Sequence, residues 1–194
     1  MIPLLRAYIR KIDAMNYRIG RFAMYGIFAM IAILLWSSFT KIASVPSLWT
    51  LEAAQFAIIA YFFIGGPYSI QMGSHVRMDL FYEPWPTRKK ALIDSITVLC
   101  LLVYLAVLLW GAIGSTAYSL GYFGSEPFAF LAGLALGSEE VGTLERSRTI
   151  WRPYLWPIKA VMCIGAALML LQALSELFKD ILRLRGEAIE AIEA

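Results

Sequence analysis

Histidine and cysteine, the residues that most often hold metals and haem, are almost missing from this chain. There is one histidine, His75, and the two cysteines, Cys100 and Cys163, lie far apart in apolar segments. A haem held by two histidines is therefore excluded, and no His, Cys, Asp or Glu cluster has the spacing of a metal site. No nucleophile stands beside a recognisable base. We expect no cofactor, no metal and no catalytic residue in this chain.

Charge is also scarce. Charged residues make up 16% of the sequence, against about 25% in ordinary soluble domains. Hydrophobic residues make up 60%, which is more than a single soluble core can bury, so we expect a membrane around the protein. The net charge of +3 is too small for a nucleic-acid partner, which requires a concentrated basic face.

Four apolar segments are long enough to cross about 30 Å of hydrocarbon as helices, which takes about 20 residues. They cover residues 22–39, 51–70, 91–118 and 158–178. The sequence therefore predicts an all-α membrane protein, a single integral domain over residues 1–194, whose four transmembrane helices pack as a rigid apolar bundle. A fifth apolar piece, residues 128–137, has half the needed length. It predicts an interfacial or re-entrant segment inside a long loop over residues 119–157.

Positive charge fixes the expected orientation. Most of the 17 lysines and arginines lie before the first span, between the second and third, or after the fourth. The positive-inside rule then places both termini in the cytoplasm and the 119–157 loop in the periplasm.

Residues 1–20 have the pattern of an amphipathic helix. The pattern predicts a helix lying on the inner leaflet, with its arginines near lipid headgroups. The apolar side carries Leu5, Tyr8, Ile9 and Ile12, and the other side carries Arg6, Arg10 and Asp13.

The centres of the four spans carry no ionised side chain, which argues against an ion or proton pathway through this chain. Glu52, Asp94, Glu176 and Asp180 fall at span ends, where we expect solvated or interfacial positions. Gln55 and Gln172 are expected to form hydrogen bonds between helices. The pair Gly111 and Ser115, four residues apart, allows close helix packing, either within this subunit or against a partner.

The stretch GGPYSIQMGSHVRMD, residues 65–79, follows the second span. Gly65-Gly66 and Pro67 predict a kink or a helix end. A short amphipathic segment should then lie at the cytoplasmic interface, with Arg77 and Asp79 facing water. We interpret His75 as an interfacial residue that caps a turn or pairs with Asp79, and the alternative is a role in proton handling.

Two motifs carry a family resemblance. The sequence GSHVRMD at residues 73–79, and WRPYLWPI at residues 151–158 before the fourth span, are similar to the small membrane subunit of TRAP transporters, the tripartite ATP-independent periplasmic systems. That subunit is the Q component, and the chain resembles the DctQ type. The four spans with both ends inside also agree. The resemblance covers most of the chain except residues 120–149, which we interpret as a subgroup insertion.

The resemblance implies a multi-pass protein of the bacterial inner membrane, working in a heteromeric complex. Its partners would be a periplasmic substrate-binding protein and a large membrane subunit, the M component, with membrane lipids around both subunits. The large subunit would carry an organic acid together with sodium in an elevator-like movement, so that substrate and sodium contacts lie outside this chain. The small subunit would be a non-catalytic scaffold for this sodium-coupled symport.

A basic cluster marks the outer loop. Arg146, Arg148 and Arg152 follow the acidic residues Glu139, Glu140 and Glu145. The arginines are candidates for steering the periplasmic binding protein by charge, and the alternative is an ordinary solvated loop. Two other functions stay open from the sequence. One is a stand-alone small exporter acting as a homodimer, and the other is a membrane anchor subunit of a redox complex.

Overall fold

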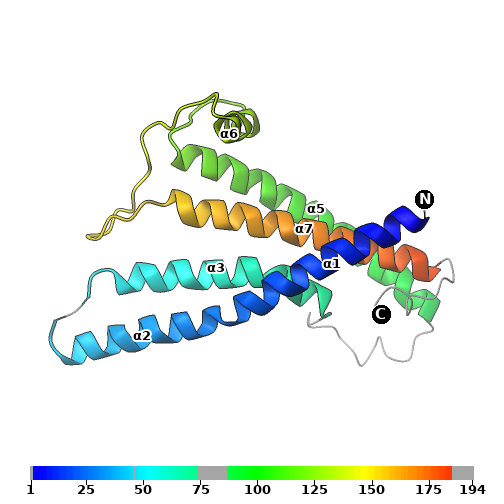
Figure 1. The fold of residues 1–194 in the computed structure, drawn as a ribbon, viewed down its shortest axis with the longest axis horizontal. Coiled ribbons are helices and arrows are strands. Elements are labelled where there is room, and N and C mark those ends of the chain that lie inside the picture. Colours follow the sequence, from blue (N-terminus) through cyan, green and yellow to red (C-terminus); the bar gives the residue numbers. More distant parts are fainter. Residues whose placement is uncertain (1, 46, 74–86, 185–194) are drawn as a thin grey trace.

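The computed structural model describes residues 2–45, 47–73 and 87–184. This part of the chain is helical and forms no strand (Figure 1). Its helices are α1 (Ile2–Met24), α2 (Gly26–Ile42), α3 (Thr50–Gln71), α5 (Thr87–Ser119), α6 (Pro127–Leu136) and α7 (Trp156–Leu184). Four helical stretches are long and apolar enough to cross a membrane: Pro3–Ile42, Thr50–Gln71, Leu92–Ser119 and Trp156–Leu184. The predicted all-α membrane fold with four such helices is confirmed.

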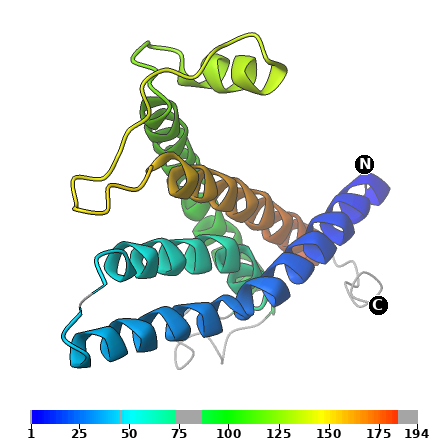
Figure 2. The same cartoon turned by 60° about the vertical axis from the view of Figure 1, so that its left-hand side comes forward.

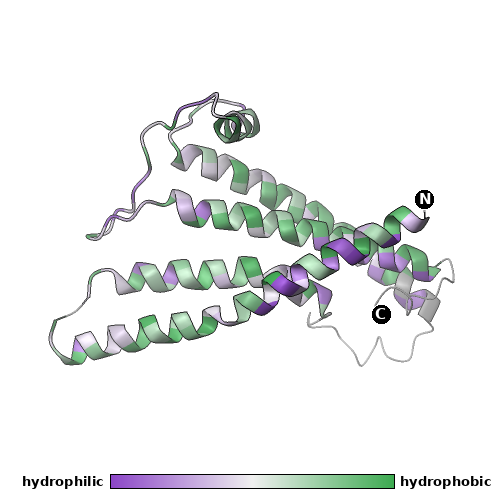
Figure 3. Cartoon of the chain, in the orientation of Figure 1, coloured by the Kyte–Doolittle hydropathy of each residue, from purple (hydrophilic) through white to green (hydrophobic). Residues whose placement is uncertain are grey.

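The long helices stand side by side in a row rather than in a closed bundle. α3 packs between α2 and α7, and α7 packs between α3 and α5 (Figures 1 and 2). α2 and α5 form the two edges, and α2 has no buried residue. The helices therefore form an open row rather than a closed bundle. α1 covers part of one face of this row, and many large apolar side chains elsewhere remain exposed. The green ribbon in Figure 3 marks the hydrophobic residues.

The molecule has two ends. The start of α1, the start of α5 and the end of α7 lie at one of them, here called the terminal end (Figure 1). The α2–α3 connection and the segment from α6 to α7 lie at the other, here called the loop end. This arrangement follows because the four spans run alternately from one end to the other.

α1 runs almost directly into α2, with a break at Tyr25. Two hydrogen bonds between residues three apart replace the regular α-helical pattern there. They run from Tyr25 N to Phe22 O and from Phe28 N to Tyr25 O. The helix boundary therefore lies at residue 25, later than the predicted limits of 20 and 22. α1 crosses α3 and α7 obliquely (Figures 1 and 2).

The apolar side of α1 packs against this protein's own helices. Ile9 is only 1% exposed, and the ring of Tyr8 meets that of Phe178 edge to face at 5.5 Å. Asp13, which the pattern placed on the opposite side, also contacts α7. The exposed side instead carries Arg10, Lys11 and Arg18, among other residues.

α5 and α7 are longer than the spans predicted for them. With 33 and 29 residues, they measure about 50 and 43 Å at 1.5 Å per residue, which exceeds the bilayer core of about 30 Å. α3 continues through Pro67 to Gln71. Of the two outcomes predicted at Gly65-Gly66 and Pro67, a kink or a helix end, the helix end therefore does not occur.

α6 covers the predicted short apolar segment and packs onto the loop end of α5. Phe130 of α6 is buried and stacks on the ring of Tyr122, with centroids 4.5 Å apart. Gly137 ends the helix with a φ of 75°, a left-handed conformation that glycine adopts without strain.

Candidate functional site

The residues that the sequence singled out fall into separate regions. His75, Arg77 and Asp79, with the interfacial segment predicted around them, lie outside the described residues. The remaining candidates are on α5 and in the loop that precedes α7.

Gly111 and Ser115 lie on an outward side of α5. Both are exposed, and no atom lies within 4 Å of a Cβ placed on Gly111. The structure therefore does not use this pair for packing among the described residues. Of the two alternatives left open by the sequence, contact with a partner is the one compatible with this position.

Other glycines make the close helix contacts. A Cβ on Gly165 of α7 would lie 2.6 Å from the backbone oxygen of Phe63 of α3, and one on Gly66 of α3 would lie 2.6 Å from the sulfur of Met169. Small residues allow such approach between membrane helices. This choice could not be predicted from the residues alone, because Gly66 and Gly165 lie in different helices and belong to no spaced pair.

A polar cluster joins α1 to α7 near the terminal end. Its centre is Lys179, whose Nζ lies 2.6 Å from an oxygen of Asp13 and 2.8 Å from one of Glu176. Gln172 is fully buried, accepts a hydrogen bond from Asn16 and donates to both Asp13 and Glu176. We call Asp13, Asn16, Gln172, Ser175, Glu176 and Lys179 the α1–α7 clamp; Ser175 donates to Asp13.

Two expectations for this end of α7 can be compared with the structure. The predicted interhelical hydrogen bonding of Gln172 is confirmed, with partners on α1. Of the solvated or interfacial position expected for Asp180, the solvated one does not occur, because this residue is 4% exposed and its carboxylate lies 3.0 Å from Arg183. Lys179 is 5% exposed. Buried charges are tolerated when they are paired and hydrogen-bonded. Lys179 has one such partner on α1, Asp13, and one on its own helix, Glu176.

Glu52, in the first turn of α3, is buried as well. It is 4% exposed, in contrast to the solvated or interfacial position expected. Its Oε1 accepts hydrogen bonds from the hydroxyl groups of Ser147 and Thr149, which precede α7. Its Oε2 is buried and has no hydrogen-bond partner among the described residues. Glu52 thus ties the loop before α7 to the start of α3.

That loop is a short hairpin over residues 145–155, here called the 145–155 hairpin. The backbone pairs through Ser147 N to Pro153 O at 2.9 Å and Leu155 N to Glu145 O at 3.2 Å. An ion pair between Lys159 and Glu145, at 2.6 Å, fixes its base. At the turn Arg152 has a φ of 49°, a left-handed conformation that is uncommon for residues other than glycine.

The three arginines of the basic cluster differ in their surroundings. The guanidinium of Arg146 lies 4.4 Å from the centre of the Tyr154 ring and hydrogen-bonds to the hydroxyl group of Tyr154. Arg148 and Arg152 are exposed at the tip of the hairpin. Ile150 and Trp151, which are 79% and 46% exposed, stand between them.

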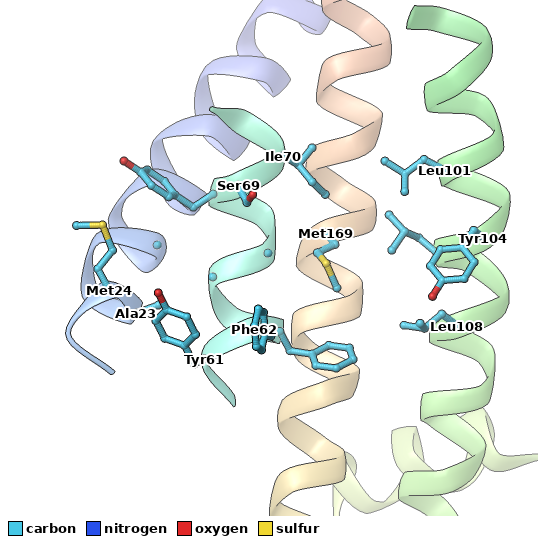
Figure 4. Close-up of a pocket in the computed structure, with 16 residues that line it drawn as sticks. Ala23, Met24, Tyr61, Phe62, Ser69, Ile70, Leu101, Tyr104, Leu108 and Met169 are labelled. Atoms are coloured by element: carbon cyan, nitrogen blue, oxygen red, sulfur yellow. The ribbon is translucent and has the colours of Figure 1, made fainter. Parts of the chain in front are cut away.

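An apolar groove runs along one face of the row, with α7 as its floor (Figure 4). Its volume is about 650 Å³. Met169 lies at the floor, Ile70 and Phe62 of α3 line one side, and Leu101 and Leu108 of α5 line the other. The lining residues include no charged side chain.

The described residues do not bring together a group of three or more His, Cys, Asp or Glu side chains that could hold a metal ion. The ionised groups instead gather at the two ends, in the α1–α7 clamp and in the 145–155 hairpin. Between these ends, residues 53–71, 95–119 and 160–175 carry no charge.

Comparison with known proteins assigns a family. Residues 30–183 match the family described as tripartite ATP-independent periplasmic transporters, DctQ component. The match takes in most of α2 and all of α3, α5 and α6, and it continues into the last turn of α7. No curated protein matches the chain.

Proposed function

The chain belongs to the DctQ component family of tripartite ATP-independent periplasmic transporters, and we propose that it is the scaffold that holds the large transport subunit of such a system in the membrane. The large subunit would move an organic acid together with sodium, and this chain would stay fixed beside it. The terminal end would face the cytoplasm and the loop end the periplasm of a bacterial inner membrane, as the positive-inside rule requires.

The row of helices is the observation that supports this role. A membrane protein that worked alone would be expected to close its helices around a path, whereas α2 and α5 leave the two edges of this row open, and α1 crosses α3 and α7. The spans carry no charge over their central residues, and a coupling site for an ion normally requires one. An open row without charge at the centres of its spans can brace a neighbour.

A subunit that stays fixed beside a moving one must itself be rigid. Two features of the structure would make this chain rigid. The α1–α7 clamp ties the oblique α1 to the row through a buried ion pair. The close contact at Gly165 lets α3 and α7 approach to backbone distance. Exposed arginines and lysines on α1 would hold anionic headgroups of the inner leaflet.

Co-expression tests the proposal. The chain, tagged, is expressed together with a large multi-span subunit encoded beside it, extracted in mild detergent and purified through its own tag. We expect a complex of the two, and substrate uptake by vesicles only when both are present. A chain that purifies alone, or that transports alone in liposomes, would rule the scaffold role out.

A further inference from the structure

The 145–155 hairpin carries charge that the molecule does not balance. Glu145 is paired with Lys159, and the guanidinium of Arg146 contacts the ring of Tyr154. Arg148 and Arg152 have no ion pair among the described residues, and both are exposed. The tip therefore presents two cations with an isoleucine and a tryptophan between them.

The hairpin is also held in one position. The hydroxyl groups of Ser147 and Thr149, one on each side of Arg148, donate to the same buried oxygen of Glu52. Hydrogen bonds to a carboxylate are about twice as strong as those between neutral groups. Two backbone bonds and the Lys159–Glu145 ion pair fix the base. The two views in Figures 1 and 2 show the loop before α7 lying beside the first turns of α3.

We propose that the periplasmic substrate-binding protein docks on the tip of the 145–155 hairpin. An acidic patch on that protein would face Arg148 and Arg152, and an apolar area inside the patch would contact Ile150 and Trp151. Glu52 positions this tip. The inference rests on the proposed function. It narrows the basic cluster to Arg148 and Arg152 and gives Arg146 a structural role against Tyr154.

The partner is a folded protein rather than a lipid surface for two reasons. A fluid membrane accepts arginine and tryptophan in any orientation, so it gains nothing from a tip that is locked by a buried carboxylate. A folded partner gains affinity from such preorganisation, because less freedom is lost on binding. Tryptophan and arginine are also the side chains that most often dominate protein interfaces.

Binding measurements test the surface. The complex of this chain with the large subunit is placed in nanodiscs, and association of the periplasmic binding protein of the same system is followed by surface plasmon resonance. We expect Arg148→Glu with Arg152→Glu to weaken binding by at least about tenfold at low salt, mainly through the association rate. Lys41→Glu, which reverses an exposed charge at the same end, should change it by less than about twofold.

Salt provides a second readout. Wild-type association should slow as ionic strength rises from about 0.01 to about 0.15 M, over which the Debye length falls from about 30 to about 8 Å. The doubly reversed variant should lose this dependence. Ile150→Ser with Trp151→Ser should instead speed dissociation and leave the salt dependence in place, because it removes apolar contact and no charge.

Glu52 is tested as a positioning residue. Glu52→Ala should weaken docking, and Glu52→Gln should restore most of it, because the amide oxygen still accepts both hydroxyl groups. Ser147→Ala with Thr149→Val breaks the same contacts without altering α3. This pair should weaken docking as Glu52→Ala does, while assembly with the large subunit stays normal. If wild type, Glu52→Ala and the Ser147–Thr149 variant all bind the periplasmic protein equally well, Glu52 does not position the tip.

These experiments distinguish failure of the proposed scaffold function from failure of the docking surface. A wild-type complex that neither takes up substrate nor binds the periplasmic protein overturns the proposed function and the docking surface together. A wild-type complex that does both, with the Arg148–Arg152 variant equally active, overturns the docking surface alone. Quenching of Trp151 by brominated phosphatidylglycerol in the nanodisc, unchanged when the periplasmic protein is added, would place the tip in the membrane and also overturn it.

Discussion

Lys179 offers the most direct test of how the row is held together. It is the one cation of the α1–α7 clamp, and its ammonium group faces carboxylates on two sides, Asp13 from α1 and Glu176 from its own helix. The change Lys179→Met keeps most of the apolar stem and removes the charge. Both carboxylates then lose their ion-pair partner in a place that water hardly reaches.

The expected cost follows from burial. The side chains of Lys179, Asp13 and Glu176 are 7%, 19% and 20% exposed. Breaking a buried ion pair by removing one partner costs about 3–5 kcal/mol, and the partial exposure of the carboxylates favours the lower end. A loss of about 3 kcal/mol corresponds to a decrease of roughly 6–12 °C in the melting temperature of a chain of this size.

Thermal unfolding of the purified protein in detergent, followed by tryptophan fluorescence, measures this decrease. Lys11→Met is the matched control, because Lys11 is an exposed lysine of α1, where substitutions usually change stability by less than about 0.5 kcal/mol. Adding Asp13→Asn and Glu176→Gln to Lys179→Met removes the stranded charges and should recover more than half of the loss. The recovery measures coupling among the three groups.

Equal melting temperatures for Lys179→Met and Lys11→Met would refute the reasoning, because the buried pair would then contribute nothing to the joining of α1 and α7. A triple variant that is less stable than Lys179→Met would also contradict it, since the stranded carboxylates would not be the cause of the loss.

Three further predictions concern packing. Gly165→Ala should lower the melting temperature, since its Cβ would lie 2.6 Å from the backbone oxygen of Phe63 and overpacking costs about 1–3 kcal/mol; an unchanged melting temperature would mean that α3 and α7 separate freely. Gly111→Leu with Ser115→Leu should leave the melting temperature of the isolated chain unchanged and reduce co-purification with the large subunit, and full recovery of the complex would exclude this side of α5 from the interface. Phe130→Ala should cost about 3–5 kcal/mol of local stability and speed proteolysis near α6, with unchanged cleavage as the contrary result.

Much of the fold could be read from the residues alone. The four apolar segments, the short one at residues 128–137 and the amphipathic start each became a helix, because length and hydrophobic pattern are local properties. The boundaries were less accurate. α1 ends at Met24 and α5 begins at Thr87, a few residues beyond the predicted limits, because an apolar pattern does not mark the residue at which a helix starts or stops.

The candidate site was predictable only in part. The basic cluster drew attention to this loop, but it did not separate Arg146, which contacts Tyr154, from Arg148 and Arg152. The burial of Glu52 could not be predicted from the sequence, because the two hydroxyl groups that donate to it lie 95 and 97 residues further along the chain. Contacts at such separation depend on which helices become neighbours.

The sequence by itself determined that this protein is a membrane protein with four apolar helices and without charge at their centres, because the hydrophobic effect acts on each segment independently of the others. Only the tertiary structure decided that these helices form a row, that Gly165 rather than Gly111 makes the close contact, and that Lys179 and Glu52 are buried. Those outcomes depend on the crossing of α1 over α7 and on the return of the hairpin to α3. In each case the paired groups are distant in sequence, so that packing alone brings them together.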